Sequence, residues 1–125
     1  MNVNISATKD YYNSITDSLL CDCGYCRSYR LQVKSTFPKV SAYLDSLGID
    51  IEKPFEASPP EPDETGMLEY CCCQYVAFGK CEPKYHHKID DIAFRIATSY
   101  PSTGIAQEHF VIELYPIQLK FKECN

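Results

Sequence analysis

The sequence predicts an α+β fold, in which two tandem helices near the N-terminus pack on an antiparallel sheet of three or more strands. Three observations lead to this prediction. Between residues 24 and 48, apolar residues recur every three or four positions, which is the period of a helix face. After residue 66 they alternate, as in strands. A proline-rich stretch, 49–66, separates the two patterns.

The composition suits one globular domain, which we expect to span all 125 residues. The net charge of -5 argues against nucleic-acid binding, because neutralising phosphates requires clustered Lys and Arg. No apolar stretch approaches the roughly 18 residues of a membrane span, and the N-terminus lacks a secretory pattern. We therefore expect a cytoplasmic protein that binds neither nucleic acid nor a membrane, with another protein as its candidate partner.

The first twenty residues carry the weakest pattern. Val3, Ile5 and Ala7 alternate with polar residues, which predicts a short strand within residues 1–9. Residues 11–20 mix Ser, Thr and Asn with apolar side chains, so they favour a second short strand or a loop leading to the first cysteines.

Two helices are expected between residues 24 and 48. Tyr29 and Val33 mark the apolar face of the first helix. Pro38 interrupts it, because proline lacks an amide hydrogen, and proline is favoured in the first turn of a new helix. Val40 and Leu44 mark the buried face of that second helix, which a glycine ends.

Residues 49–66 form the one break in composition. Four prolines alternate with Glu and Asp there, a spacing that favours a long extended loop. Loops of this length in compact domains are functional or disordered. Two interpretations stay open, an acidic surface connection and a segment that docks a partner.

Three antiparallel strands are expected after residue 66, at 67–78, 89–100 and 109–121. The apolar phase of the last one shifts at Pro116, which suits a bulge or a sheet edge. Residues 101–104 contain Pro and Gly and favour a turn.

The eight cysteines concentrate the candidate chemistry. In the cytoplasm they should be thiols, and Cys23 and Cys26 have the C-x-x-C spacing of half a zinc site. We predict a structural zinc held by Cys21, Cys23, Cys26 and Cys73. Other pairings for the second half of the site involve Cys71, Cys81, His86 and His87.

A redox alternative rests on the same motif. The "CGYC" at the start of a predicted helix resembles the C-x-x-C of thioredoxin-like proteins and glutaredoxins, which implies Cys23 as nucleophile and Cys26 as resolving thiol. The resemblance covers only these four residues. The hydrophobic strand that precedes such a motif and the helix–strand alternation that follows it are missing here.

A third interpretation is that the cysteines only pack, because cysteine behaves in a protein core like a small hydrophobic residue. Nothing else in the chain indicates an enzyme, since it has no nucleophile elbow and no phosphate-cradling glycine loop. We therefore favour a non-enzymatic binding domain with a cysteine-ligated metal, and keep a thiol-disulfide oxidoreductase as the alternative.

Three segments, "CDCGYCRSY", "LGIDIEKPFE" and "EPDETGMLEYCCCQY", together resemble a family of small uncharacterised bacterial proteins with a C-x-C-x-x-C-R motif. The resemblance spans residues 21 to about 75. It implies a cytoplasmic single-domain protein and carries over no activity.

Overall fold

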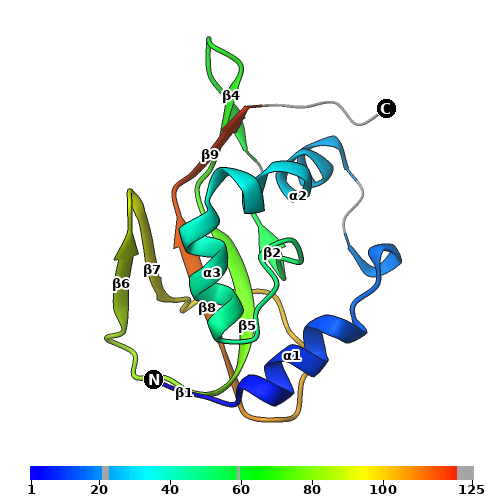
Figure 1. Cartoon of the computed structure of the whole chain (residues 1–125), viewed down its shortest axis with the longest axis vertical. Helices are drawn as coiled ribbons and strands as arrows, with labels where there is room; N and C mark the ends of the chain where they lie inside the picture. The colour runs from blue at the N-terminus through cyan, green and yellow to red at the C-terminus, as the bar shows by residue number, and fades with distance from the viewer. Residues whose placement is uncertain (21–22, 59, 121–125) are drawn as a thin grey trace.

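The computed structural model describes residues 1–20, 23–58 and 60–120, and its architecture is α+β (Figure 1). Helices gather on one side of curved antiparallel sheets. The elements in these ranges are β1 (Asn2–Val3), α1 (Ile5–Ser14), the 3-10 helix η1 (Asp17–Leu19), α2 (Gly24–Thr36), α3 (Pro38–Ser46), β2 (Glu56–Ala57), β3 (Glu61–Pro62), β4 (Met67–Tyr70), β5 (Cys73–Lys80), β6 (His86–Ile89), β7 (Ile92–Ile96), β8 (His109–Tyr115) and β9 (Ile117–Lys120).

The strands form two antiparallel sheets. The larger has the strand order β1-β5-β8-β7-β6, with β2 paired to β5 as well, and the smaller has the order β3-β4-β9. The chain passes between them three times, from β2 to β3, from β4 to β5 and from β8 to β9. Together the strands curl like half of a barrel.

The strands expected at 67–78 and 109–121 are therefore each two strands in different sheets. The first divides at Cys71 and Cys72, and the second at Pro116, whose peptide bond with Tyr115 is cis. A proline can stand there because its missing amide hydrogen falls between two ladders of hydrogen bonds.

The strand expected within residues 1–9 is present only as β1 (Asn2–Val3), because the chain from Ile5 onward belongs to α1. Asn4 caps this helix, and its side chain accepts a hydrogen bond from the Ala7 N–H at 3.0 Å. Thr8 and Tyr12, one turn apart, form its buried face, and the Tyr12 hydroxyl donates to the Val76 carbonyl at 2.7 Å. The expected tandem pair of helices, α2 and α3, is therefore preceded by a third helix, α1.

The helices α2 and α3 both lie between residues 24 and 48. Tyr29 and Val33 are the large buried residues of α2, and Val40 and Leu44 are those of α3. The amide of Phe37 closes α2 on the Val33 carbonyl at 3.0 Å, and Pro38 then opens α3.

The segment 49–66 contains two short strands, where the sequence favoured only an extended loop. β2 joins the large sheet beside β5, and β3 joins the small sheet beside β4. Ile49 and Ile51 are buried, so the start of the segment belongs to the core. The segment is therefore attached to both sheets.

Tyrosines contribute much of the core and keep their hydroxyls bonded. Tyr75 donates to the Ile51 carbonyl at 2.6 Å, so Tyr29 is the donor in its 2.5 Å bond to the Tyr75 hydroxyl. This chain of hydrogen bonds joins α2, β5 and the 49–66 segment beneath the site described below.

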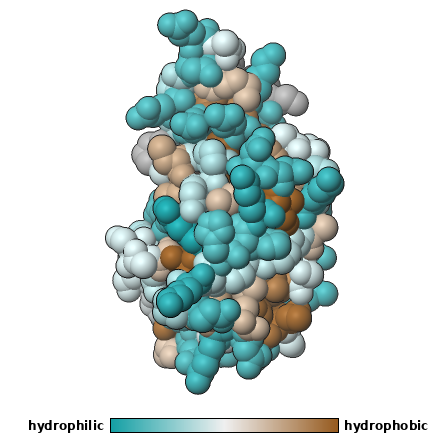
Figure 2. Space-filling view, turned by 90° about the vertical axis from the view of Figure 1, so that its left-hand side faces the viewer, coloured by the Kyte–Doolittle hydropathy of each residue, from teal (hydrophilic) through white to brown (hydrophobic). Residues whose placement is uncertain are grey.

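The outer surface beside β6 and β7 is mostly hydrophilic, with hydrophobic side chains in small separate patches (Figure 2). No helix in the described ranges has both the length and the apolar character that crossing a membrane requires.

Candidate functional site

The CGYC motif forms the first turn of α2. Cys23 is its N-cap, in extended backbone conformation, and its Sγ accepts a hydrogen bond from the Cys26 N–H at 3.4 Å. The Cys23 carbonyl accepts the first helical hydrogen bond, from the Arg27 N–H at 3.0 Å. A helix N-terminus carries partial positive charge, so negative charge on an N-cap side chain is stabilised there.

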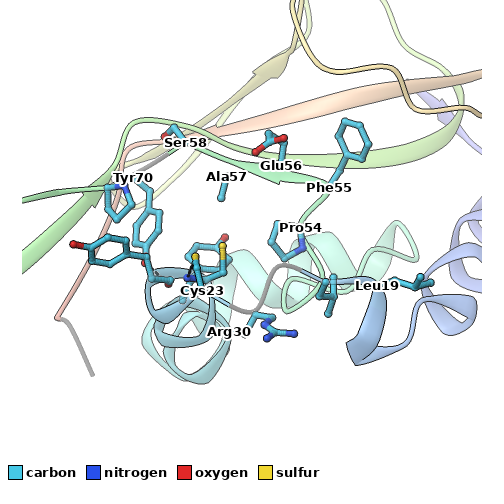
Figure 3. A pocket seen from close by; sticks show the side chains of 14 residues that line it. Leu19, Cys23, Arg30, Pro54, Phe55, Glu56, Ala57, Ser58 and Tyr70 are labelled. Carbon is cyan, nitrogen blue, oxygen red and sulfur yellow. Dashed lines mark hydrogen bonds between the residues drawn. The ribbon is translucent and has the colours of Figure 1, made fainter. Parts of the chain in front are cut away.

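A pocket of about 340 Å³ opens beside this turn (Figure 3). Cys23 and Arg30 stand on the α2 side, and Ala57 points toward them from the opposite wall. Its other walls are mainly aromatic, aliphatic and proline side chains, as is typical of small-molecule sites. The remaining lining residues are Leu19, Leu20, Tyr25, Cys26, Tyr29, Pro54, Phe55, Glu56, Ser58, Pro60 and Tyr70.

The rim of the pocket exposes apolar surface to solvent. Leu19 is 71% exposed and Tyr25 is 42% exposed, and both line the pocket. Exposed apolar surface next to a concave site is a common mark of ligand binding.

Hydrogen bonds hold the two walls in place. The Tyr70 hydroxyl donates to the Tyr25 carbonyl at 2.7 Å, which attaches the start of α2 to β4. On the other wall, Ser58 and Cys72 exchange hydrogen bonds, with the Ser58 N–H donating to the Cys72 carbonyl and the Cys72 N–H to the Ser58 Oγ, both at 3.0 Å. Ala57 lies opposite Cys73 in the β2–β5 pair, so this wall is part of the sheet.

Three of the four predicted metal ligands influence the pKa of one hydroxyl, that of Tyr70. The pKa of Tyr70 is raised by burial first, and then by the negative charge that Cys73, Cys26 and Cys23 would carry when ionised. The start of α2 and the start of β5 thus approach each other around Tyr70.

The predicted zinc site stays a prediction. Cys21 lies outside the described residues. Within residues 1–20, 23–58 and 60–120, no three His, Cys, Asp or Glu side chains converge in a way that could hold a metal ion. His86 and His87, alternative ligands, lie on β6, where the His87 ring stacks on Tyr43.

The second cysteine cluster has a different environment. Cys71 is exposed, Cys72 is half-buried and Cys73 is fully buried. Burial raises the pKa of Cys73 to about 12. Burial also raises the pKa of Cys72, and the neighbouring Glu113 carboxylate raises it further. Since the thiolate is the reactive form, Cys72 and Cys73 are poor nucleophiles.

Sequence reasoning missed the wall that faces the motif. The proline-rich composition of 49–66 marked the segment as unusual, but nothing in its pattern showed that Pro54 and Ala57 face Cys23. Tyr70 was also missed, because a tyrosine in a strand reads as ordinary core.

Comparisons of the chain with protein-family models, curated proteins and solved structures found no match. The function is therefore argued from the pocket and its residues.

Proposed function

We propose that this chain is a binding domain that holds a small ligand with an apolar body in the pocket at the start of α2. One observation carries the proposal: the CGYC motif and the proline-rich segment face each other across a single cavity. The two stretches that deviate most from ordinary core or surface sequence thus share one site.

The geometry supports binding because the pocket is already assembled. Tyr70 holds one wall and the β2–β5 pairing holds the other. A preformed site avoids the free energy of ordering loops when the ligand arrives. The cavity of about 340 Å³ is large enough for an aromatic ring with a short substituent.

The test is a titration with a small aromatic probe, p-cresol, followed by backbone amide NMR shifts. We expect saturable shifts in residues 23–30 and 54–58. Ala57→Phe fills the pocket and should weaken binding at least about tenfold, as loss of most of a buried ring contact would. Ala106→Phe, in an exposed loop, is the matched control and should leave binding unchanged.

Tyr25→Ser is a second variant, since Ala57 is partly packed against the core. Folding of each variant is checked by the dispersion of its amide spectrum. Undiminished binding in both folded variants, or no binding of p-cresol to the unmodified protein, would contradict the proposal.

Thiol-disulfide exchange is a second candidate, and the position of Cys23 favours it. Its Sγ is at an exposed helix N-cap on the wall of an apolar pocket, with Cys26 one turn along. Disulfide oxidoreductases use this placement, because the helix N-terminus stabilises the attacking thiolate.

The chemistry would run in two steps. The Cys23 thiolate attacks a substrate disulfide, forming a mixed disulfide and releasing one substrate thiolate. Cys26, deprotonated, then attacks the Cys23 sulfur and releases the second thiolate. The protein is oxidised by two electrons and the substrate is reduced by two, and a cellular thiol reductant restores the pair.

An insulin-reduction assay with dithiothreitol tests this candidate. Cys23→Ser should abolish the protein-dependent rate, whereas Cys71→Ser, another exposed cysteine, should retain it. An equal rate for the unmodified protein and Cys23→Ser would exclude the oxidoreductase and leave the binding proposal standing.

The structural zinc predicted at Cys21, Cys23, Cys26 and Cys73 is tested separately, by elemental analysis of protein purified without a metal-affinity tag. About one zinc per chain, lost in Cys73→Ala, would support that site. Metal-free protein with unchanged stability after chelation would contradict it.

A further inference from the structure

Arg30 is a charged side chain that the proposed binding function leaves unused. It lines the pocket two turns along α2 from Cys23, and it is half-buried. Its Nε is buried and has no hydrogen-bond partner, and no ion pair to Arg30 is present within the described residues. Guanidinium groups that are partly removed from water usually have an acceptor, because an unmet donor costs free energy.

The helix geometry sets Arg30 beside the cysteines. Cys23, Cys26 and Arg30 are spaced at i, i+3 and i+7, so they lie on one face of α2. Figure 3 shows Arg30 on the same side of the pocket as Cys23, with Pro54 and Ala57 across from them.

No other charged side chain points into the pocket from its described lining. Glu56 contributes to the opposite wall, but its side chain is exposed and points to the far side of its strand, away from α2. Among the described lining residues, the charge directed at a bound ligand is therefore positive, from Arg30 and from the N-terminus of α2.

We infer that Arg30 makes this pocket selective for ligands that combine an apolar ring with a carboxylate. The ring lies against the aromatic and proline walls, and the carboxylate pairs with the guanidinium, which matches a carboxylate with two parallel donors. This inference rests on the proposed binding function and adds the chemical class of its ligand.

Two probes with the same ring test it, 3-phenylpropionate and 3-phenylpropanol, titrated separately by NMR. We expect the anion to bind about fivefold more tightly than the alcohol, the effect of one charge pair about 4 Å apart in a largely aqueous setting. Arg30→Gln should remove that preference by weakening the anion alone, with the affinity for the alcohol unchanged.

Lys34→Gln is the matched control, because it removes the same charge from α2 at an exposed position outside this pocket. It should retain most of the preference. Equal binding of both probes to the unmodified protein, or an anion preference that survives in Arg30→Gln, would overturn the assignment of Arg30 while the binding function stands. If neither probe binds, the binding function itself fails.

Discussion

The two cysteine clusters carry the same side chain in opposite surroundings. Cys23 is exposed at the N-terminus of α2, with the Cys26 N–H directed at its sulfur. Cys73 is fully buried at the start of β5, and burial raises its pKa to about 12. The difference shows that the secondary-structure element and its burial set the environment of a cysteine: Cys23 lines the pocket, and Cys73 packs in the core.

The burial of Cys72 is intermediate between that of Cys23 and that of Cys73, and its thiol borders a network of polar side chains. Glu113 accepts hydrogen bonds from Gln74 at 2.9 Å and from Arg95 at 2.5 Å, and its carboxylate also faces the Cys72 thiol. A thiol beside a carboxylate is held in its neutral form. This network therefore extends the contrast with Cys23 along the second cluster.

The largest expected effect is in alkylation of the native protein at pH 8. Burial raises the pKa of Cys73 from its ordinary value of 9.0 to about 12, which lowers its thiolate fraction about 1000-fold, before any steric shielding. Cys23, which is exposed, should react with iodoacetamide in the native protein, and Cys73 only as the protein unfolds. Peptide mass spectrometry measures both, and in concentrated urea the rates should converge. Comparable alkylation rates for Cys23 and Cys73 in the native protein would contradict the difference in environment between the two cysteines.

The second effect is a loss of stability in alkaline solution. Burial raises the pKa of Tyr12, Tyr29, Tyr75 and Cys73, so the folded protein keeps protons that the unfolded chain releases. The free energy of unfolding is then unaffected by these groups below their pKa values in the unfolded chain, about 8.5 for Cys and 10 for Tyr. It falls as the pH rises above those values. Urea unfolding between pH 7 and 11 measures the fall. Tyr29→Phe should make the free energy of unfolding fall less steeply with pH above pH 10. An unchanged slope would mean that the raised pKa of buried Tyr29 does not cause the loss of stability.

A smaller effect separates serine substitutions in the second cluster. Cys73→Ser places a more polar group in the core and should cost about 1–3 kcal/mol. Cys71→Ser, at an exposed position two residues earlier, should stay within about 0.5 kcal/mol of the unmodified protein. Chemical denaturation compares them directly, and equal losses would mean that Cys73 is less buried than described.

The smallest effect is expected at Cys23 itself. Serine is a good N-cap, and its hydroxyl can accept the hydrogen bond from the Cys26 N–H that the sulfur accepts now. Cys23→Ser should therefore change the free energy of unfolding by no more than about 0.5 kcal/mol, while Cys23→Ala should lose about 1 kcal/mol. A large loss in Cys23→Ser would indicate that the sulfur has a structural role, such as metal binding.

Periodicity in the sequence predicted α2 and α3 well, because Tyr29, Val33, Val40 and Leu44 are apolar at helical spacing. The same reasoning failed for α1. Its buried face consists of Thr8 and Tyr12, whose hydroxyls meet the sheet, so a pattern of apolar residues does not reveal it.

The presence of strands after residue 66 was predictable, but their number and their division between sheets were not: the strand expected at 89–100 is β7 (Ile92–Ile96), preceded by β6 (His86–Ile89). Residues 67–78 read as one continuous apolar run, yet the chain changes sheet at Cys71 and Cys72. A run that is apolar on both faces carries no mark of such a change.

The first turn of α2 is the part of the site that local sequence accounts for. The bond between Cys23 and Cys26 spans three residues, and Arg30 follows at helical spacing, so local interactions suffice. The pocket, by contrast, forms only when distant segments pack together. Its far wall is set by the pairing of β2 with β5, and its end by the Tyr70 bond to Tyr25, 45 residues away. Such contacts depend on which distant segments pack together, and no local pattern encodes that choice.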